Sequence, residues 1–152
     1  MKNLIQMSLL SASIGLSGMS TSAHADDNGY DAANPAESLN SIDARKCGSR
    51  TASGLGYQML QIGKGPRPGK DAKVKVGYAG YFMSDGSKFD SSPSAQFPVG
   101  GVIKGFGEGV MLLNRGAKIR ICIPYGLGYG DSGKGPIPAK SNLIFYVELL
   151  DF

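Results

Sequence analysis

Histidine is nearly absent from this chain, since His24 is the only one among its 152 residues. It lies in a segment with the features of a secretory signal peptide: Lys2, a mostly apolar stretch at residues 4–16, and small residues before a cleavage point near Ala25. Removal of residues 1–25 would leave a mature chain without histidine. The usual hydrolase triads, histidine zinc sites and imidazole acid–base catalysis would then lack their central residue.

Long apolar runs and dense carboxylate clusters are missing as well. Residues 4–16 are too short to span a bilayer and are interrupted by Gln6, so we expect a periplasmic or secreted protein without stable membrane insertion. The 12 Asp and Glu show no close spacing inside an apolar stretch. This argues against a carboxylate metal site or paired-carboxylate hydrolysis, and we expect no metal and no other cofactor.

The cationic side chains are scattered in the sequence. Once Lys2 is removed, 15 of the 16 Lys and Arg remain against 12 Asp and Glu. Lysines and arginines such as Lys64, Arg67 and Lys70 are not interleaved with aromatic residues, as base stacking would require. The pattern predicts a solvated surface and argues against nucleic acid as a partner.

Glycine and proline, by contrast, are abundant, with 23 and 8 residues, which is typical of a turn-rich β protein. Residues 26–53 are polar and small and are predicted to form an N-terminal arm, whereas residues 54–152 are predicted to form the core domain. Alternation of apolar and polar residues predicts strands in this domain. They are expected at residues 55–62, 73–83, from 89 to a break at Pro93, 118–123 and 143–150.

Between residues 102 and 114 the apolar spacing changes to that of a helix, with Phe106, Val110 and Leu113 on one face. Three glycines in this segment each weaken a helix by roughly 1 kcal/mol relative to alanine, so packing against the sheet must hold it in place. The predicted fold class is α+β, a curved antiparallel β-sheet of five or six strands wrapped around one short α-helix.

A glycine-rich segment at residues 128–134 matches the first seven positions of the phosphate-binding loop pattern, G-x-x-x-x-G-K. However, Gly135 follows where Ser or Thr should bind magnesium, and Pro136 and Pro138 are incompatible with the helix whose amino end would bind phosphate. Residues 124–142 are therefore predicted to be a flexible loop that borders a pocket.

Five sequence phrases follow one another between residues 77 and 152: GYAGYF, DGSKFDSS, FPVGGVIKGFGEGV, IPYGLGYG and LIFYVELL. In this order they resemble the FKBP-type peptidyl-prolyl cis/trans isomerases. The resemblance implies the same sheet and helix, rotamase activity on proline-containing polypeptides, and inhibition by macrolides such as rapamycin. The polar arm is too short for the long dimerisation helix of some secreted relatives, so we expect a monomer.

Isomerisation of proline bonds suits a chain without histidine. Rotation about an Xaa-Pro bond crosses a barrier of roughly 18 to 20 kcal/mol because amide resonance is lost in the twisted state. An apolar cavity favours the twisted state, which has less charge separation to solvate. Neither a nucleophile nor a metal is required.

The resemblance assigns three residues to catalysis. Asp90 lies in the FDSS phrase, Tyr129 would donate its hydroxyl to Asp90 or to a peptide carbonyl, and the Ile103 N–H near the helix start would hold another carbonyl. The other pocket residues are apolar or aromatic, and several would equally suit an ordinary β core. They are Tyr78, Phe89, Phe97, Val102, Phe106, Ile137 and Phe145.

Phe106 stands where most of the family has a tryptophan as the floor of the pocket. Because the phenylalanine ring is smaller, proline and macrolides are expected to be held less tightly.

Two other readings of function stay open at this point. One is a proline-directed peptide-binding chaperone with little turnover, and the other is an adhesion or interaction module that uses residues 26–56. Cys47 and Cys122 also allow two readings. In an oxidising compartment they could form a disulfide that holds the arm across the back of the sheet, or they could remain free thiols.

Overall fold

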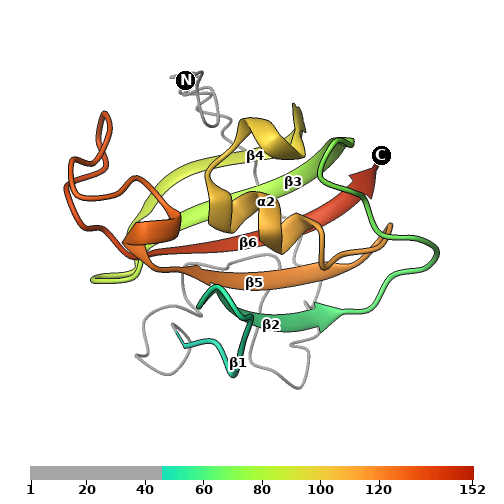
Figure 1. Cartoon of the computed structure of the whole chain (residues 1–152), viewed down its shortest axis with the longest axis horizontal. Helices are drawn as coiled ribbons and strands as arrows, with labels where there is room; N and C mark the ends of the chain where they lie inside the picture. Colours follow the sequence, from blue (N-terminus) through green and yellow to red (C-terminus); the bar gives the residue numbers. More distant parts are fainter. Residues whose placement is uncertain (1–45) are drawn as a thin grey trace, which may run out of the picture.

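The computed structural model describes residues 46–152, so the predicted signal peptide and most of the predicted arm lie outside the described residues. Residues 46–152 form one antiparallel sheet of six strands in the order β1-β2-β5-β6-β3-β4, and α2 lies across one face of it (Figure 1). This is the predicted fold class. The strands are β1 (Ser49–Arg50), β2 (Gly56–Gln61), β3 (Lys73–Phe82), β4 (Lys88–Pro98), β5 (Lys118–Ile123) and β6 (Leu143–Asp151).

The alternation of side chains places the main core on the face that α2 covers. Val74, Val76 and Tyr78 in β3 are buried there, whereas Lys73 and Lys75 on the same strand are exposed. Apolar side chains at every second position give each strand one buried face. The predicted bounds of β2, β3, β5 and β6 agree with the structure to within one residue at each end.

Helix α2 (Lys104–Val110) is shorter than the predicted helix at residues 102–114. Ile103 caps its amino end, and two short turns follow Val110, with N–H groups of Leu112 and Leu113 bonded three residues back. The predicted apolar face is nevertheless correct, since Phe106, Val110 and Leu113 are all buried.

The glycines of α2 allow the helix to lie close to β5. A Cβ atom at Gly105 would lie 2.7 Å from Cγ2 of Ile123, and one at Gly109 would lie 2.9 Å from Cγ2 of Ile121. Real Cβ atoms do not approach other atoms so closely, so alanine at either position would push the helix away from the strand. The glycines that weaken the isolated helix are thus required by its packing.

Strand β4 runs through Pro93, so the prediction that this proline ends the strand is wrong. The register moves from Val76 opposite Ala95 to Tyr78 opposite Ser92, which leaves an extra residue on β4 next to the proline. In addition, β4 is an edge strand. Proline lacks an N–H to donate, but an edge strand or a bulge does not require one there.

The opposite face of the sheet carries a second buried cluster. Tyr81 of β3 and Ile144 and Tyr146 of β6 form this cluster, and the rings of Tyr81 and Tyr146 meet edge to face at 5.9 Å between centroids. Tyr81 exposes only 1% of its surface. Some side chains that point away from α2 are therefore buried against one another and not exposed to solvent.

Cys47 and Cys122 form a disulfide, which is one of the two readings that the sequence left open, and the described residues include no free cysteine. The bond lies beside Gly56 of β2, where a Cβ atom would be 3.0 Å from Cβ of Cys47. Just after Cys47, β1 pairs with β2. Residues 47–50, which we predicted as part of the arm, are thus attached to the sheet.

The loop at residues 124–142 begins with a 3₁₀ turn, η3 (Tyr125–Leu127). Where a phosphate-binding loop would start its helix, Lys134 and Ile137 instead exchange two backbone hydrogen bonds of 2.9 and 3.0 Å in a tight turn. Gly133 has a positive φ of 69° there, and a Cβ atom would collide with the Ile137 carbonyl oxygen.

No helix among residues 46–152 is long and apolar enough to span a membrane.

Candidate active site

The centre of the candidate site is the ring of Phe106, which α2 holds against the sheet. Its centroid lies 5.1 Å from that of Phe145, 5.4 Å from Phe97 and 5.9 Å from Tyr78, each in an edge-to-face arrangement. The three partners come from β6, β4 and β3, one from each strand. Aromatic pairs prefer this geometry because the positive edge of one ring meets the negative face of the other.

Phe89 extends the aromatic cluster toward the start of β4. Its ring centroid lies 5.5 Å from that of Phe145 and 4.9 Å from that of Phe82. Gly80 makes room for this contact, since a Cβ atom there would lie 2.6 Å from Phe145 and 2.8 Å from Phe89. Only glycine permits both rings to approach β3 so closely.

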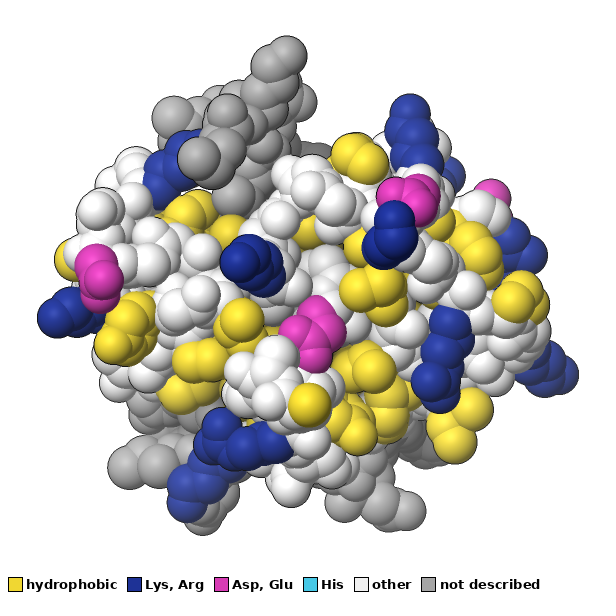
Figure 2. Space-filling view, in the orientation of Figure 1, with side chains coloured by type: hydrophobic (Ala, Val, Ile, Leu, Met, Phe, Trp, Pro, Cys, Tyr) yellow, Lys and Arg dark blue, Asp and Glu magenta, His cyan; other side chains and the backbone are white. Residues whose placement is uncertain are grey.

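Four further predicted residues pack against the same cluster. Ile103 and Ile137 are buried, whereas Val102 and Tyr129 remain partly exposed. All nine apolar and aromatic residues that the sequence analysis assigned to the site thus belong to one cluster of side chains. Hydrophobic side chains reach the surface in several places on the face that carries α2, as Figure 2 shows.

Asp90 joins the site through Tyr78. The Tyr78 hydroxyl donates a hydrogen bond of 2.9 Å to Oδ2 of Asp90. Of the two acceptors that the sequence analysis left open for the Tyr129 hydroxyl, Asp90 is bonded to Tyr78 instead, and donation to a peptide carbonyl stays a prediction. Tyr78 reaches the carboxylate because β3 and β4 pair side by side, with Gly80 opposite Asp90 and Tyr78 two residues away on the same face.

Burial raises the pKa values of these polar groups. Desolvation is the main reason that the pKa of Asp90 lies above its usual 3.8, and the hydrogen bonds from Tyr78 and from the Ser91 backbone partly oppose the increase. Desolvation also raises the pKa of Tyr78, and so does its hydrogen bond to the carboxylate. The pKa of Tyr129 is raised by burial and by the nearby charge of Asp90. Both tyrosines are therefore hydroxyl donors at neutral pH.

The backbone at the start of α2 supplies another donor. The Ile103 carbonyl accepts the hydrogen bond of the Gly107 N–H, but no described group accepts one from the Ile103 N–H. Such N–H groups at the amino end of a helix lack a partner within the helix. The Tyr129 hydroxyl likewise has no hydrogen-bond partner among the described residues.

The arrangement is an apolar aromatic cluster with a few polar groups at its edge. Among residues 46–152 there is no group of three or more His, Cys, Asp or Glu side chains that could hold a metal. Sequence reasoning missed Gly80 and Phe82, and it missed the pairing of Tyr78 with Asp90. The available signal for Gly80, Phe82 and Tyr78 was the GYAGYF phrase, in which small and aromatic residues occur together.

The structure is a small α+β domain with an aromatic cluster between a short helix and a curved antiparallel sheet, and comparisons place it in a family. Residues 65–150 match the family described as FKBP-type peptidyl-prolyl cis-trans isomerase. The chain is 42% identical over 135 residues to the FKBP-type peptidyl-prolyl cis-trans isomerase FkpA of Aeromonas hydrophila, covering 86% of this chain and 50% of that protein. It is also 42% identical to the FKBP-type 22 kDa peptidyl-prolyl cis-trans isomerase of Escherichia coli (strain K12), covering 72% of this chain and 55% of that protein.

Solved structures agree with this assignment. The crystal structure of FkpA from Escherichia coli has a TM-score of 0.66 at 40% identity, covering 68% of this chain and 50% of that chain. A peptidyl-prolyl cis-trans isomerase from Pseudomonas syringae has a TM-score of 0.65 at 31% identity, covering 80% and 97%. The chain belongs to the FKBP-type peptidyl-prolyl cis-trans isomerase family. It spans about half the length of the first curated relatives that it matches.

Proposed function

We propose that this protein catalyses cis/trans isomerisation of Xaa-Pro bonds in polypeptides. The observation that carries the proposal is the aromatic cluster around Phe106, with the Tyr78–Asp90 pair and the free Ile103 N–H at its edge. Membership of the isomerase family supports the same reaction. Rotation about the proline bond requires groups that bind the polypeptide, and it requires neither a nucleophile nor a metal. The aromatic cluster and the polar groups at its edge are groups of this kind.

The apolar rings lower the barrier by removing water from the imide. In the planar imide, resonance separates charge between oxygen and nitrogen, and water stabilises that charge. The twisted imide lacks this resonance and carries less separated charge. It therefore gives up less hydration energy than the planar imide when it moves from water into the apolar site. A site that binds the twisted state more tightly than the planar states accelerates rotation in both directions. The partly exposed rings of Phe97 and Phe89 offer the surface against which the proline ring would pack, and the buried rings of Phe106 and Phe145 support them from beneath.

The polar groups orient the peptide in the proposed site. The Ile103 N–H and the Tyr129 hydroxyl, which have no described partners, each donate to a carbonyl oxygen of the bound chain. The Asp90 carboxylate, fixed by Tyr78, lies at the edge of the apolar cluster and orients the imide. Because Phe89 and Val102 are partly exposed beside these groups, we propose that apolar residues before proline are preferred.

The substrates that we propose are proline-containing polypeptides outside the cytoplasm, with the protein acting as a monomer. The disulfide between Cys47 and Cys122 supports an oxidising compartment, and the signal-peptide pattern at residues 1–25 supports export. Macrolides would occupy the same aromatic site and inhibit the reaction.

A protease-coupled assay of short Xaa-Pro peptides tests the proposal. We expect the full chain to accelerate the slow phase, and Phe106→Ala to remove the acceleration because it empties the centre of the cluster. Circular dichroism must show that the variant remains folded. A wild-type protein that prevents aggregation of unfolded proteins but leaves the slow phase unchanged would instead be a peptide-binding chaperone.

A further inference from the structure

Several cationic side chains that are far apart in the sequence lie close together in the fold. They lie at the end of the sheet where β6 ends. Lys64 lies beside Arg115, to which it is joined by a backbone bridge. Lys75 of β3 is opposite Asp151 of β6, and Lys118 of β5 is opposite Glu148. We call Lys64, Lys75, Arg115 and Lys118 the basic end. Dark-blue side chains are numerous at the right-hand side of Figure 2, where Figure 1 places the C-terminus and the loop between β2 and β3.

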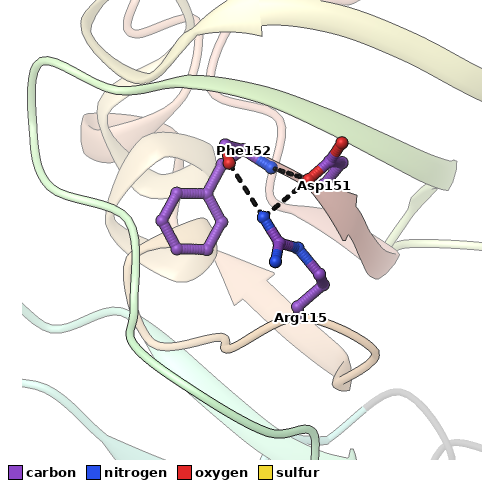
Figure 3. A network of polar contacts seen from close by, with 3 residues as sticks. All are labelled: Arg115, Asp151 and Phe152. Carbon is purple, nitrogen blue, oxygen red and sulfur yellow. Dashed lines mark hydrogen bonds and ion pairs between the residues drawn. The ribbon is translucent and has the colours of Figure 1, made fainter.

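Most of the positive charge at the basic end has no partner. Arg115 is the exception, because its Nη2 atom lies 2.7 Å from Oδ1 of Asp151 and donates a 3.0 Å hydrogen bond to the Phe152 carbonyl oxygen (Figure 3). The Arg115 guanidinium also lies 5.3 Å from the centroid of the Phe152 ring. The side chains of Lys64, Lys75 and Lys118 form no ion pair or hydrogen bond among residues 46–152. Arg115 thus contacts both Asp151 and Phe152, and the three lysines leave this end of the molecule positively charged.

An open groove of about 450 Å³ lies at the basic end. Lys64 and Arg115 line it together with Glu148, Leu149 and Leu150, and Gly65 and Gly116 contribute backbone. None of these residues belongs to the candidate active site. The groove therefore combines cationic side chains, apolar surface and one carboxylate at a position separate from the aromatic cluster.

We propose that this groove binds an extended acidic segment of the polypeptide whose proline bond is isomerised. This inference rests on the proposed function. Lys64 in the groove attracts carboxylates, and Lys118 and Lys75, opposite Glu148 and Asp151 on the neighbouring strands, add positive charge beside it. Leu150 offers apolar contact, and Glu148 can accept a hydrogen bond from a backbone N–H of the bound segment. A second contact of this kind holds the client near the aromatic site and raises its local concentration there.

A polypeptide fits the groove better than a phosphate-rich ligand does. The backbone of a nucleic acid carries a phosphate on every unit, so a charge must come close to Glu148, whereas a peptide backbone is uncharged, donates its N–H groups to Glu148, and leaves its acidic side chains free to face the lysines. Single-stranded nucleic acid would also need aromatic rings for stacking, and the aromatic ring of this network, that of Phe152, already faces Arg115.

The test is a titration of the full chain, at low ionic strength, with a fluorescently labelled peptide of Glu and Ser that contains no proline. We expect binding by fluorescence anisotropy, weakening as salt is added, and no binding of the matched peptide with Gln in place of Glu. The double variant Lys64→Glu/Lys75→Glu should bind the acidic peptide about tenfold or more weakly. The matched control Lys134→Glu/Lys140→Glu, which makes the same change of charge in the loop at residues 124–142, should bind like the wild type.

Equal weakening by both double variants would overturn the proposal, because net charge rather than the groove would then hold the peptide. Tighter binding of phosphatidylglycerol vesicles or of a single-stranded oligonucleotide than of the acidic peptide would overturn it as well. The isomerase assay on short peptides reports separately on the proposed function. The Lys64→Glu/Lys75→Glu variant should keep full turnover of short peptides but accelerate refolding of an acidic, proline-limited protein less than the wild type does.

Discussion

Removing the Tyr78 hydroxyl should destabilise the protein by an amount that depends on pH. Tyr78→Phe deletes the donor that lies 2.9 Å from Oδ2 of Asp90, while the ring contacts with Phe106 and Phe145 remain. A hydrogen bond to a charged group contributes roughly 1.5 to 3 kcal/mol to stability. Because Asp90 is only partly buried, water can replace part of the interaction, and we expect a loss of about 1.5 kcal/mol at neutral pH.

The pH dependence follows from the raised pKa of Asp90. A carboxyl group whose pKa is higher in the folded state than in the unfolded state favours folding below its usual pKa of 3.8, and this stability is lost as the pH rises through the folded pKa. The Tyr78 hydrogen bond lowers the folded pKa, so Tyr78→Phe raises it further. The difference in unfolding free energy between wild type and variant should therefore be small at acidic pH and should increase toward neutrality.

Urea unfolding followed by circular dichroism at several pH values measures this difference. Tyr129→Phe is the matched control, since it deletes the same group from a tyrosine whose hydroxyl has no partner among the described residues. We expect it to change stability by less than about 0.5 kcal/mol, while slowing turnover about threefold to tenfold if its hydroxyl binds substrate. Equal losses of stability in the two variants, or a loss for Tyr78→Phe that stays constant between about pH 4 and 7, would refute the reasoning.

Four further outcomes are expected. Isomerase activity should be nearly flat between about pH 6 and 8, because residues 46–152 contain no histidine, and a bell-shaped profile with a pKa near 6.5 would contradict desolvation as the mechanism. Phe106→Trp should tighten macrolide binding in a calorimetric titration but cost roughly 1 to 3 kcal/mol of stability, since Phe106 is fully buried among other rings; unchanged affinity would count against Phe106 as the floor. The double variant Cys47→Ser/Cys122→Ser should lose about 4 kcal/mol for a sequence separation of 75 residues, and an unfolding midpoint insensitive to reductant would contradict this. Gly109→Ala should destabilise the protein although it favours the helix by about 1 kcal/mol, because its Cβ would lie 2.9 Å from Ile121; a more stable variant would show that α2 can move at no cost.

The strands were the most predictable part of the fold, because alternation reports directly on burial. It marked Val74 and Val76 as inward residues, and both are fully buried. It could not reveal that β4 is an edge strand, since neighbours in a sheet come from distant parts of the chain, and Pro93 was therefore misread as a break. Tyr81 shows the same limit. Alternation along the strand predicts that its side chain points away from α2. It does not predict that the side chain packs against Tyr146 on that face.

The candidate site was predictable as a set of residues but not as a set of interactions. The motifs named the side chains around Phe106, and the structure brings them into one cluster. Their ligand contacts stay a prediction. The hydrogen bond from Tyr78 to Asp90 was not anticipated, because it depends on how β3 and β4 are paired, and a single sequence does not specify that register.

Helix α2 shows why a locally unfavourable sequence is required at such a site. The proposed mechanism needs both the Ile103 N–H and the Phe106 ring at the sheet, and α2 supplies both from its first turn. A helix with alanine at 105 and 109 would be more stable alone, but its Cβ atoms would force it away from Ile121 and Ile123. Phe106 would then withdraw from Phe145 and Phe97, whose ring centroids now lie 5.1 and 5.4 Å from its own. The glycines therefore lower the helix propensity of α2 but allow the close packing that holds the aromatic cluster together. Helix propensity alone does not reveal this requirement, because it depends on the distance between α2 and β5.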